Sequence, residues 1–447
     1  MTAAGSRDLI PFRQALKAWF LISLQTFGGP AGQIAVMQRT LVDEHRWIGQ
    51  QRFLHALNYC MLLPGPEAQQ LAIYTGWLLN GTRGGLAAGT LFVLPGMLTM
   101  LALSAGYVAF GDTTAVLALF AGLAPAVLAI VADAVVKVGR RALHNTPQRA
   151  IAAAAFLTLT FLKAPFPAVL VAAALLGWAL GRHGPRADAA AAGPAALVTD
   201  DALPDEKPAA RRLTTILLIG AALWAAPLVA VVALFGTASV FATQGFFFSG
   251  TALVTFGGAY AVLAFVAQRA VEVYHWLAPA EMVRGLALAE TTPGPLIMVV
   301  QFVAFVGAYR NPGPLNPWLA ATLGALLTTW VTFVPCFLFV FLGAPYVERL
   351  RHHAALSAAL TGITAAVVGV IGNLAVYLAL HTLFRATDER TWGPVHLAWP
   401  DLGTWRPLAV GIAALAALLI GQWSVLRTLA VCAALGAAAA VAGLPLT

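Results

Sequence analysis

Charged residues are scarce in this sequence. Asp, Glu, Lys and Arg make up 10% of its 447 residues, whereas a soluble domain carries about 25%. Hydrophobic residues make up 60%, and the mean hydropathy is +0.81. Too few charges are present to cover a water-exposed surface, which excludes a soluble enzyme, a disordered scaffold and a nucleic-acid-binding protein. The net charge of +8 is typical of a membrane protein with basic cytoplasmic loops.

The sequence also lacks the motifs of several catalytic and energy-coupling sites. Each of the four Lys is followed by Ala, Val or Pro, so there is no phosphate-binding P-loop. There is no H-E-x-x-H, no G-x-S-x-G and no C-x-x-C, and the nine His form no ligand-spaced cluster. We therefore expect no metal, no cofactor and no enzymatic activity. A secondary transporter or channel driven by gradients fits better.

Five apolar stretches are long enough to cross a bilayer, which needs about 20 residues. They are 86–110, 116–138, 213–236, 318–342 and 354–383. Shorter apolar pairs lie at 150–162 with 166–180, and at 407–420 with 423–441. The stretch 182–212 is rich in Ala, Pro, Asp and Arg and has no apolar period, which predicts a flexible linker.

Short motifs recur in the two halves of the chain at a spacing of 229 residues. Thr26-Phe27-Gly28-Gly29 returns as Thr255-Phe256-Gly257-Gly258, and Pro64-Gly65-Pro66 returns as Pro293-Gly294-Pro295. Trp47 and Trp276 keep the same spacing. This order and spacing predict two homologous halves: a first repeat (1–181), a cytoplasmic linker (182–212) and a second repeat with an added leading helix (213–447).

Each recurring motif interrupts an apolar stretch that is too short to span a membrane. Pro removes a backbone donor and Gly permits unusual dihedral angles, so helices should stop and restart there. The distribution of Lys and Arg favours halves of inverted orientation, with the N-terminus and the linker cytoplasmic. We predict an all-α, polytopic integral membrane protein of the inner (plasma) membrane, built from inverted-repeat halves with broken or re-entrant helices.

Matching interruptions in two halves are the best sequence indicator of a transporter's binding site. A helix that restarts inside the membrane points free amides and the positive end of its dipole, about half a charge, into the interior. Four such ends could hold an anion, with Thr hydroxyls and Gln amides as further donors. Simple kinks and close helix contacts are the alternative interpretation. The candidate substrate-binding residues are Thr26, Phe27, Gly28, Gly29, Gln33, Pro64, Gly65, Pro66, Gln69, Gln70, Thr255, Phe256, Gly257, Gly258, Thr291, Thr292, Pro293, Gly294 and Pro295.

These motifs resemble those of the chromate ion transporter family, in its long-chain two-domain type. The resemblance lies in Phe-Gly-Gly near the start of each half, in Leu-Pro-Gly-Pro-x-x-x-Gln-Leu-Ala-x-Tyr-x-Gly at 63–76, and in Glu-Thr-Thr-Pro-Gly-Pro-Leu at 290–296. It covers nearly the whole chain. It implies chromate efflux and chromate resistance, with sulfate as a tetrahedral look-alike. The second-half counterpart of Gln70-Leu71-Ala72 is Val299-Val300-Gln301, so the two halves differ in the residues that follow the Pro-Gly-Pro motifs.

Export suits a divalent anion. A dianion gains about 4.6 kcal/mol per 100 mV on leaving an inside-negative cell. Proton exchange stays open, and Glu290 is the candidate proton-coupling residue because it directly precedes the second Pro-Gly-Pro region. A helix cap or a partner for Arg284 is the alternative for Glu290. Arg284 is a candidate for attracting the substrate or for gating, and a snorkelling Arg is its alternative.

Other transport and non-transport functions are weaker alternatives. Sulfate or another oxyanion, including its import, is the alternative within the same class. An enzyme acting on a lipid phosphate and a purely structural protein are remote ones. The expected partners are the oxyanion and membrane lipids, without nucleic acid, and a homodimer is left open. We also expect Asp133 to pair with Lys137, and Trp392, Trp399 and Trp405 to lie in an interfacial aromatic belt.

Overall fold

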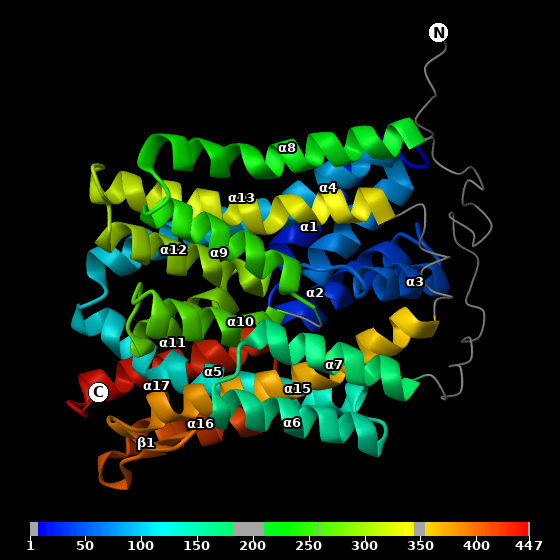
Figure 1. Cartoon of the computed structure of the whole chain (residues 1–447). Helices are drawn as coiled ribbons and strands as arrows, with labels where there is room; N and C mark the ends of the chain where they lie inside the picture. The colour runs from blue at the N-terminus through cyan, green and yellow to red at the C-terminus, as the bar shows by residue number, and fades with distance from the viewer. Residues whose placement is uncertain (1–7, 182–209, 257–258, 344–353, 446–447) are drawn as a thin grey trace.

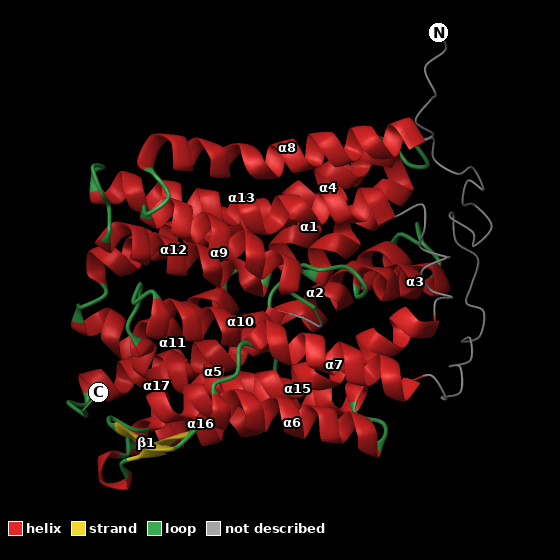
Figure 2. Ribbon diagram, in the orientation of Figure 1, coloured by secondary structure: helices red, strands yellow, loops and turns green. Residues whose placement is uncertain are grey.

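The computed structural model describes residues 8–181, 210–256, 259–343 and 354–445. The chain forms a bundle of long helices whose axes run broadly in one direction, with shorter helices between them (Figure 1). Figure 2 shows that the described part is helical apart from one small two-stranded sheet. The predicted all-α class is confirmed.

The first half begins with short helices and continues with longer ones. Its α-helices are α1 (Phe12–Gln25), α2 (Gly29–Gln38), α3 (Gln50–Cys60), α4 (Glu67–Phe110), α5 (Thr114–Ala142), α6 (Thr146–Leu162) and α7 (Phe166–Gly181). A π-helical turn, Arg39–Glu44, extends α2. Inside α4, Asn80 and Gly81 leave the helical conformation, so a short first segment is followed by a long second one.

The second half follows the same order after an additional leading helix. Its α-helices are α8 (Ala210–Phe235), α9 (Val240–Val254), α10 (Ala259–Gln268), α11 (Pro279–Thr291), α12 (Val299–Arg310), α13 (Pro317–Gly343), α15 (Ala354–Leu383), α16 (Pro407–Leu419) and α17 (Val425–Val441). A π-helical turn, Arg269–Val273, extends α10, and 3-10 turns lie at Leu296–Met298 and Leu402–Thr404.

The two halves repeat each other in local structure as well as in sequence. Trp47 stacks on His45 with ring centroids 4.5 Å apart, and Trp276 stacks on Tyr274 at the same distance. The two Trp amides donate equivalent backbone hydrogen bonds of 2.8 Å to residues six positions earlier. Both pairs lie between a π-helical turn and the next short helix. The duplicated sequence therefore forms the same connection between a π-helical turn and a short helix in both halves.

The halves are interlocked rather than placed side by side. α5 packs against α16 and α17 of the other half, while its counterpart α15 packs against α6 and α7. The second segment of α4 contacts α13, and α5 contacts α15. α8 covers α9 and α13 from outside. A helix from one half therefore completes the core of the other.

Among the described residues, five helices are long and apolar enough to cross a membrane: α4, α5, α8, α13 and α15. They correspond to the five spans expected from the sequence. Many apolar side chains stay on the surface, such as Leu218 of α8, which is 64% exposed. Exposed apolar surface of this extent is suited to lipid rather than water. Together these features define a multi-pass α-helical membrane protein.

A β-hairpin interrupts the helical pattern between α15 and α16. Strands β1 (Thr387–Trp392) and β2 (Val395–Pro400) pair antiparallel, with Gly393 at a φ of +60° in the turn. The sequence analysis predicted only an aromatic belt in this region. The predicted Trp side chains are exposed, but Trp392 and Trp399 lie on the strands, and Trp405 follows the 3-10 turn Leu402–Thr404. Lys163, in the turn after α6, forms an ion pair with Glu389 of β1 and ties the hairpin to the bundle.

The bundle has two distinct ends. Figure 1 shows the hairpin, the start of α11 and the C-terminus at one end, which we call the hairpin end. It shows α3, the end of α7 and the start of α8 at the other end. Along α5, which joins the two ends, Lys137 and Asp133 form the predicted ion pair at 2.7 Å.

Candidate functional site

The two Pro-Gly-Pro motifs form buried turns between short helical segments. The first turn connects α3 to α4, and the second connects α11 to α12 through a 3-10 turn. Gly65 and Gly294, at the centres of the motifs, have φ values of +121° and +96°, which L side chains rarely adopt. The Pro residues on either side limit helix continuation. The predicted helix breaks are confirmed at both motifs.

The Thr-Phe-Gly-Gly motifs also separate short helices. α1 ends before Thr26, and α2 starts after Gly28, which has a φ of +78°. In the second half α9 ends before Thr255 and α10 starts at Ala259, while Gly257 and Gly258 lie outside the described residues. Both Thr side chains are buried, and Phe27 and Phe256 are half-buried.

Each Pro-Gly-Pro turn contacts the Thr-Phe-Gly-Gly segment of the other half. The amide of Gly65 donates a 2.8 Å hydrogen bond to the carbonyl oxygen of Thr255. The amide of Gly294 donates a 2.9 Å hydrogen bond to the carbonyl oxygen of Thr26. The two bonds are equivalent under the 229-residue spacing. Tertiary structure therefore brings all four motifs together in two reciprocal contacts.

Buried glutamines support the two turns. Gln33 Nε2 donates to the Gly294 carbonyl oxygen at 2.5 Å, and Gln70 Nε2 donates to the Pro64 carbonyl oxygen at 2.6 Å. Gln69 is fully buried, and both of its side-chain polar atoms lack a partner among the described residues. Leaving a buried polar group unpaired costs about 1–3 kcal/mol. Gln69 is therefore a polar group beside the first turn that a ligand could satisfy.

The four candidate Thr hydroxyls bond to their own helices in this conformation. Thr26 donates to the Ser23 carbonyl oxygen at 2.9 Å, and Thr255 donates to that of Thr251 at 2.7 Å. The remaining pair, Thr291 and Thr292, both donate to the carbonyl oxygen of Leu288, at 2.8 and 2.7 Å. Each hydroxyl has a single hydrogen. In this arrangement the four oxygens are left as acceptors.

Glu290 lies at the second turn and contacts the first half indirectly. Its Oε1 accepts a 2.8 Å hydrogen bond from the hydroxyl of Tyr260, while Oε2 has no partner among the described residues. A Cβ placed on Gly29 would lie 3.2 Å from the same Tyr260 hydroxyl. The carboxyl of Glu290 therefore lies close to the first Thr-Phe-Gly-Gly segment. The alternative in which Glu290 pairs with Arg284 is wrong, because Glu290 accepts from Tyr260 while Arg284 donates to Tyr107.

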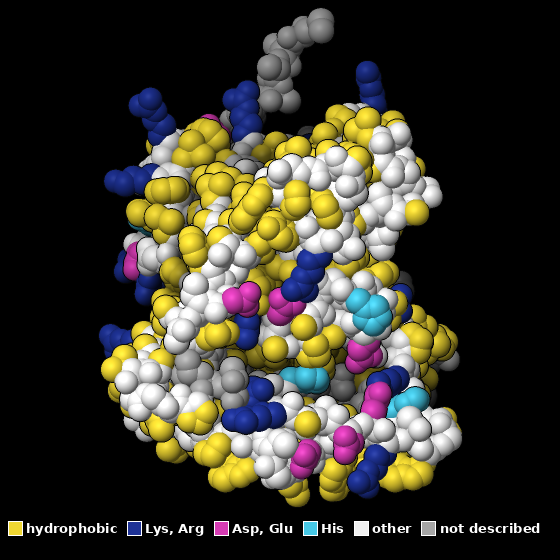
Figure 3. Space-filling view, turned by 90° about the vertical axis from the view of Figure 1, so that its left-hand side faces the viewer, with side chains coloured by type: hydrophobic (Ala, Val, Ile, Leu, Met, Phe, Trp, Pro, Cys, Tyr) yellow, Lys and Arg dark blue, Asp and Glu magenta, His cyan; other side chains and the backbone are white. Residues whose placement is uncertain are grey.

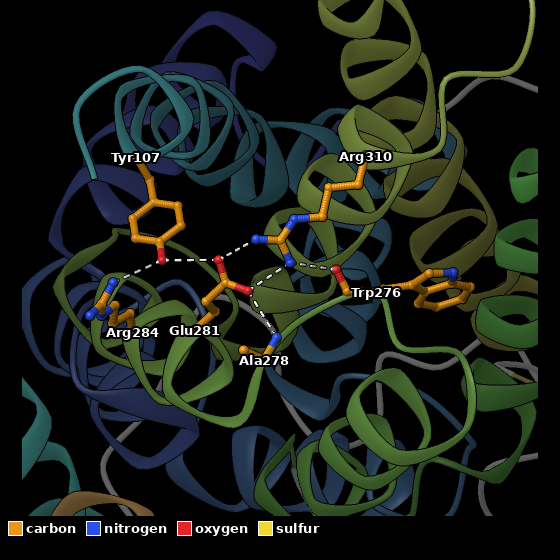
Figure 4. Close-up of polar contacts among 6 residues, drawn as sticks. All are labelled: Tyr107, Trp276, Ala278, Glu281, Arg284 and Arg310. Carbon is orange, nitrogen blue, oxygen red and sulfur yellow. Dashed lines mark hydrogen bonds and ion pairs between the residues drawn. The ribbon is translucent and has the colours of Figure 1, made fainter. Parts of the chain in front are cut away.

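Arg284 belongs to a separate polar network at the hairpin end (Figure 4). Its Nη1 donates to the Tyr107 hydroxyl at 3.1 Å, and that hydroxyl donates to Glu281 Oε1 at 3.3 Å. Glu281 also accepts two hydrogen bonds from Arg310, at 2.7 and 2.8 Å. Because Arg310 takes both oxygens of Glu281, the charge of Arg284 is not neutralised there.

Two residues near the turns were not singled out from the sequence. Tyr260 could have been noticed because it follows the second Gly-Gly by two positions. Glu67 directly follows Pro66 and forms part of the first turn of α4, where the helix dipole favours a negative charge. The two turns therefore each have a carboxyl group within three residues, on opposite sides of the Pro-Gly-Pro motif.

Fold and site together define a polytopic membrane protein with paired broken helices, an architecture found in secondary transporters. The chromate transporter family matches this chain at residues 13–178 and 242–441. The chain belongs to the chromate transporter family, as its motifs predicted. No solved structure matches it significantly.

Three relatives cover most of this chain. The chromate transport protein of Pseudomonas aeruginosa is 34% identical over 380 residues, which are 84% of this chain and 82% of the relative. That of Cupriavidus metallidurans is 30% identical over 392 residues, covering 86% and 87%. A probable chromate transport protein of Synechococcus elongatus is 26% identical over 358 residues, covering 80% and 82%.

Proposed function

We propose that this protein is a secondary transporter that exports chromate across the inner (plasma) membrane and so confers chromate resistance. The observation that carries the proposal is the reciprocal pair of contacts, Gly65 with Thr255 and Gly294 with Thr26, in a member of the chromate transporter family. Under this proposal the two halves are inverted repeats, and the N-terminus and linker are cytoplasmic.

The two Gly amides are the proposed anion donors. In the described conformation each amide is occupied by a carbonyl oxygen of the opposite half. Moving the Pro-Gly-Pro turns away from these carbonyls frees both amides close to the starts of α4 and α12, where the helix dipoles are positive. Gln69 adds amide hydrogens that have no partner among the described residues. A tetrahedral dianion presents oxygens in several directions and can accept from all of these groups.

The membrane potential sets the proposed direction. A dianion gains about 4.6 kcal/mol per 100 mV on leaving an inside-negative cell, so export requires no other energy source. Import would need at least two accompanying cations to offset the same term. Sulfate has the same shape and charge and is the expected competitor.

Glu290 is the proposed proton-coupling residue. It is 2% exposed, and within the described structure its carboxyl accepts one hydrogen bond, from the neutral hydroxyl of Tyr260. A charged carboxylate is costly in this setting and would also repel a dianion nearby. Binding of the oxyanion therefore favours a protonated Glu290, which links anion and proton movements.

Everted membrane vesicles containing the full chain test this proposal. We expect labelled chromate to accumulate in the vesicles when their interior is positive, and sulfate to compete. Vesicles without the protein control for leakage. Accumulation that requires a negative interior would overturn the proposed direction, and no protein-dependent flux of either anion would overturn transport itself.

A further inference from the structure

A cavity of about 360 Å³ lies at the hairpin end, away from the two turns. It is lined by α5, α11, the end of α15, the start of α16 and the segment after α17. Arg284 of α11, Arg385 after α15 and Arg406 before α16 line it, together with His381 and Thr382. Figure 3 views the molecule from this end and shows charged and His side chains gathered over the lower half of the face.

The three Arg side chains of the cavity have no carboxylate partner in the part of the chain that the structure describes. Its ion pairs do not include any of them, and the described lining residues contain neither Asp nor Glu. Glu281 is the acidic residue in the network of Arg284, but Arg310 occupies it (Figure 4). Among the described residues, the cavity therefore carries positive charges without a carboxylate to balance them.

The base of the hairpin holds two of these Arg residues close together. Phe384 and Trp405 form an isolated antiparallel bridge, next to Arg385 and Arg406. The amide of Arg385 donates to the Thr404 carbonyl oxygen at 3.1 Å, and that of Arg406 donates to the Leu383 carbonyl oxygen at 2.8 Å. The backbone thus keeps like charges together, although their mutual repulsion opposes it.

Polar atoms of the cavity also lack partners. Arg406 Nε and Thr382 Oγ1 are buried without a hydrogen bond in the described structure, and Thr382 is only 4% exposed. Burial, and next the positive charges of Arg385 and Arg284, lower the pKa of Arg406. An anion in the cavity would satisfy both unpaired groups and relieve the repulsion between the guanidinium groups.

We infer that this cavity is a second anion-binding site, an outer vestibule that takes the divalent oxyanion at the hairpin end. The inference rests on the proposed function for its physiological ligand. α11 connects the two sites directly, because Arg284 faces the cavity and Glu290, six residues later, lies at the second turn. The two positions are about 9 Å apart along the axis of α11, which is less than two helical turns.

Anion binding to the purified full-length protein tests the vestibule. Labelled chromate and labelled sulfate are measured by equilibrium dialysis for the wild type and for the double variant R385Q/R406Q. We expect two bound anions per chain in the wild type, and a vestibule site at least about tenfold weaker in the variant. The double variant R390Q/R427Q removes the same charge from exposed positions outside the cavity and should bind as the wild type does.

A second variant guards against misfolding of the double Arg variant. Thr382→Val keeps the side-chain volume and removes a buried hydroxyl that has no partner in the described part of the chain, so the thermal unfolding temperature should stay equal or rise. It should still weaken anion binding at the vestibule severalfold. Unchanged binding in both R385Q/R406Q and Thr382→Val would overturn the inference.

The two proposals fail in different ways. The wild type could bind two anions, lose one of them in R385Q/R406Q, and yet show no chromate flux in vesicles. That result would support the vestibule and refute the proposed transport. Alternatively, the wild type could transport chromate but bind one anion per chain, and R385Q/R406Q could leave both flux and binding unchanged. That result would refute the vestibule and support the transport.

Discussion

The amide of Gly294 donates a 2.9 Å hydrogen bond to the carbonyl oxygen of Thr26, which belongs to the other half of the chain. In the equivalent hydrogen bond the first half supplies the donor: the amide of Gly65 donates to the carbonyl oxygen of Thr255 at 2.8 Å. Since each half supplies one donor and one acceptor, the two contacts are equivalent. A movement of one half against the other is expected to break both, which would expose two amides together.

The first prediction concerns the Gly residues of the turns. Gly65→Ala should lower thermal stability and abolish chromate flux, because φ is +121° and the added Cβ would lie 2.8 Å from Cys336 Sγ. Holding a non-Gly residue in this sparsely populated backbone region costs about 1–3 kcal/mol. Gly294→Ala should have a milder effect on stability and flux, since the nearest atom to its added Cβ, Gly96 Cα, would be 3.3 Å away.

Unfolding temperature in detergent and vesicle flux measure these effects. Gly106→Ala is the matched control, because it lies inside α4 and a Cβ there meets no atom within 4 Å. Wild-type flux in Gly65→Ala would show that the first turn is not part of the transport path.

Gln33 should be essential for the second turn. Gln33→Leu removes the donor to the Gly294 carbonyl oxygen and leaves that buried acceptor unpaired, which costs about 1–3 kcal/mol. We expect a lower unfolding temperature and reduced flux. Gln25→Leu, at an exposed position of α1, serves as the control and should change little. Equal behaviour of the two variants would contradict a specific role for Gln33.

Glu290→Gln should remove the pH dependence of chromate flux while sparing anion binding, because the amide neither takes up nor releases a proton. Tyr260→Phe removes its hydrogen bond and should displace the pH profile without abolishing it. Flux is measured across a pH series, with Glu44→Gln, an exposed partner of Arg39, as the control. A pH profile of Glu290→Gln that matches the wild type would rule out the coupling role.

The hairpin contact gives a small pH effect on stability. The hydrogen bond from Lys163, and then its charge, hold the pKa of Glu389 below its ordinary value. The pair therefore stabilises the fold above about pH 4.3, the unfolded-state pKa, and the contribution is lost as pH falls through the lower folded-state pKa.

Glu389→Gln measures that contribution. The difference in unfolding free energy from wild type should be within about 1 kcal/mol at neutral pH, because the pair is largely exposed. It should shrink in acid. A difference that grows as pH falls would contradict the assigned sign.

Much of the fold follows from local patterns in the sequence. Apolar stretches of span length predicted α5, α8, α13 and α15 within a few residues. Pro64, Gly65 and their counterparts predicted where α3 and α11 end, since Pro and Gly act on the backbone locally. The hairpin was missed because Trp392-Gly393-Pro394 was interpreted from its aromatic content rather than from its turn residue and the residues that flank it.

The contacts between the halves could not be predicted in the same way. The 229-residue spacing showed that the motifs are equivalent, but not that Gly65 reaches Thr255 rather than Thr26. The partner of Glu290 depends on where α10 places Tyr260 relative to α11, and the grouping of Arg284 with Arg406 depends on the bridge at the base of the hairpin. Such pairings are tertiary and leave no local signal.

Voltage-driven flux in proteoliposomes tests the central claim most directly. Labelled chromate uptake is recorded for the wild type, Gly65→Ala and Gly106→Ala while the imposed potential is varied. We predict saturable uptake that rises as the interior becomes more positive, that sulfate inhibits, that Gly106→Ala retains and that Gly65→Ala loses. Uptake by the wild type that is independent of potential, or that Gly65→Ala leaves intact, would contradict dianion passage through the two turns.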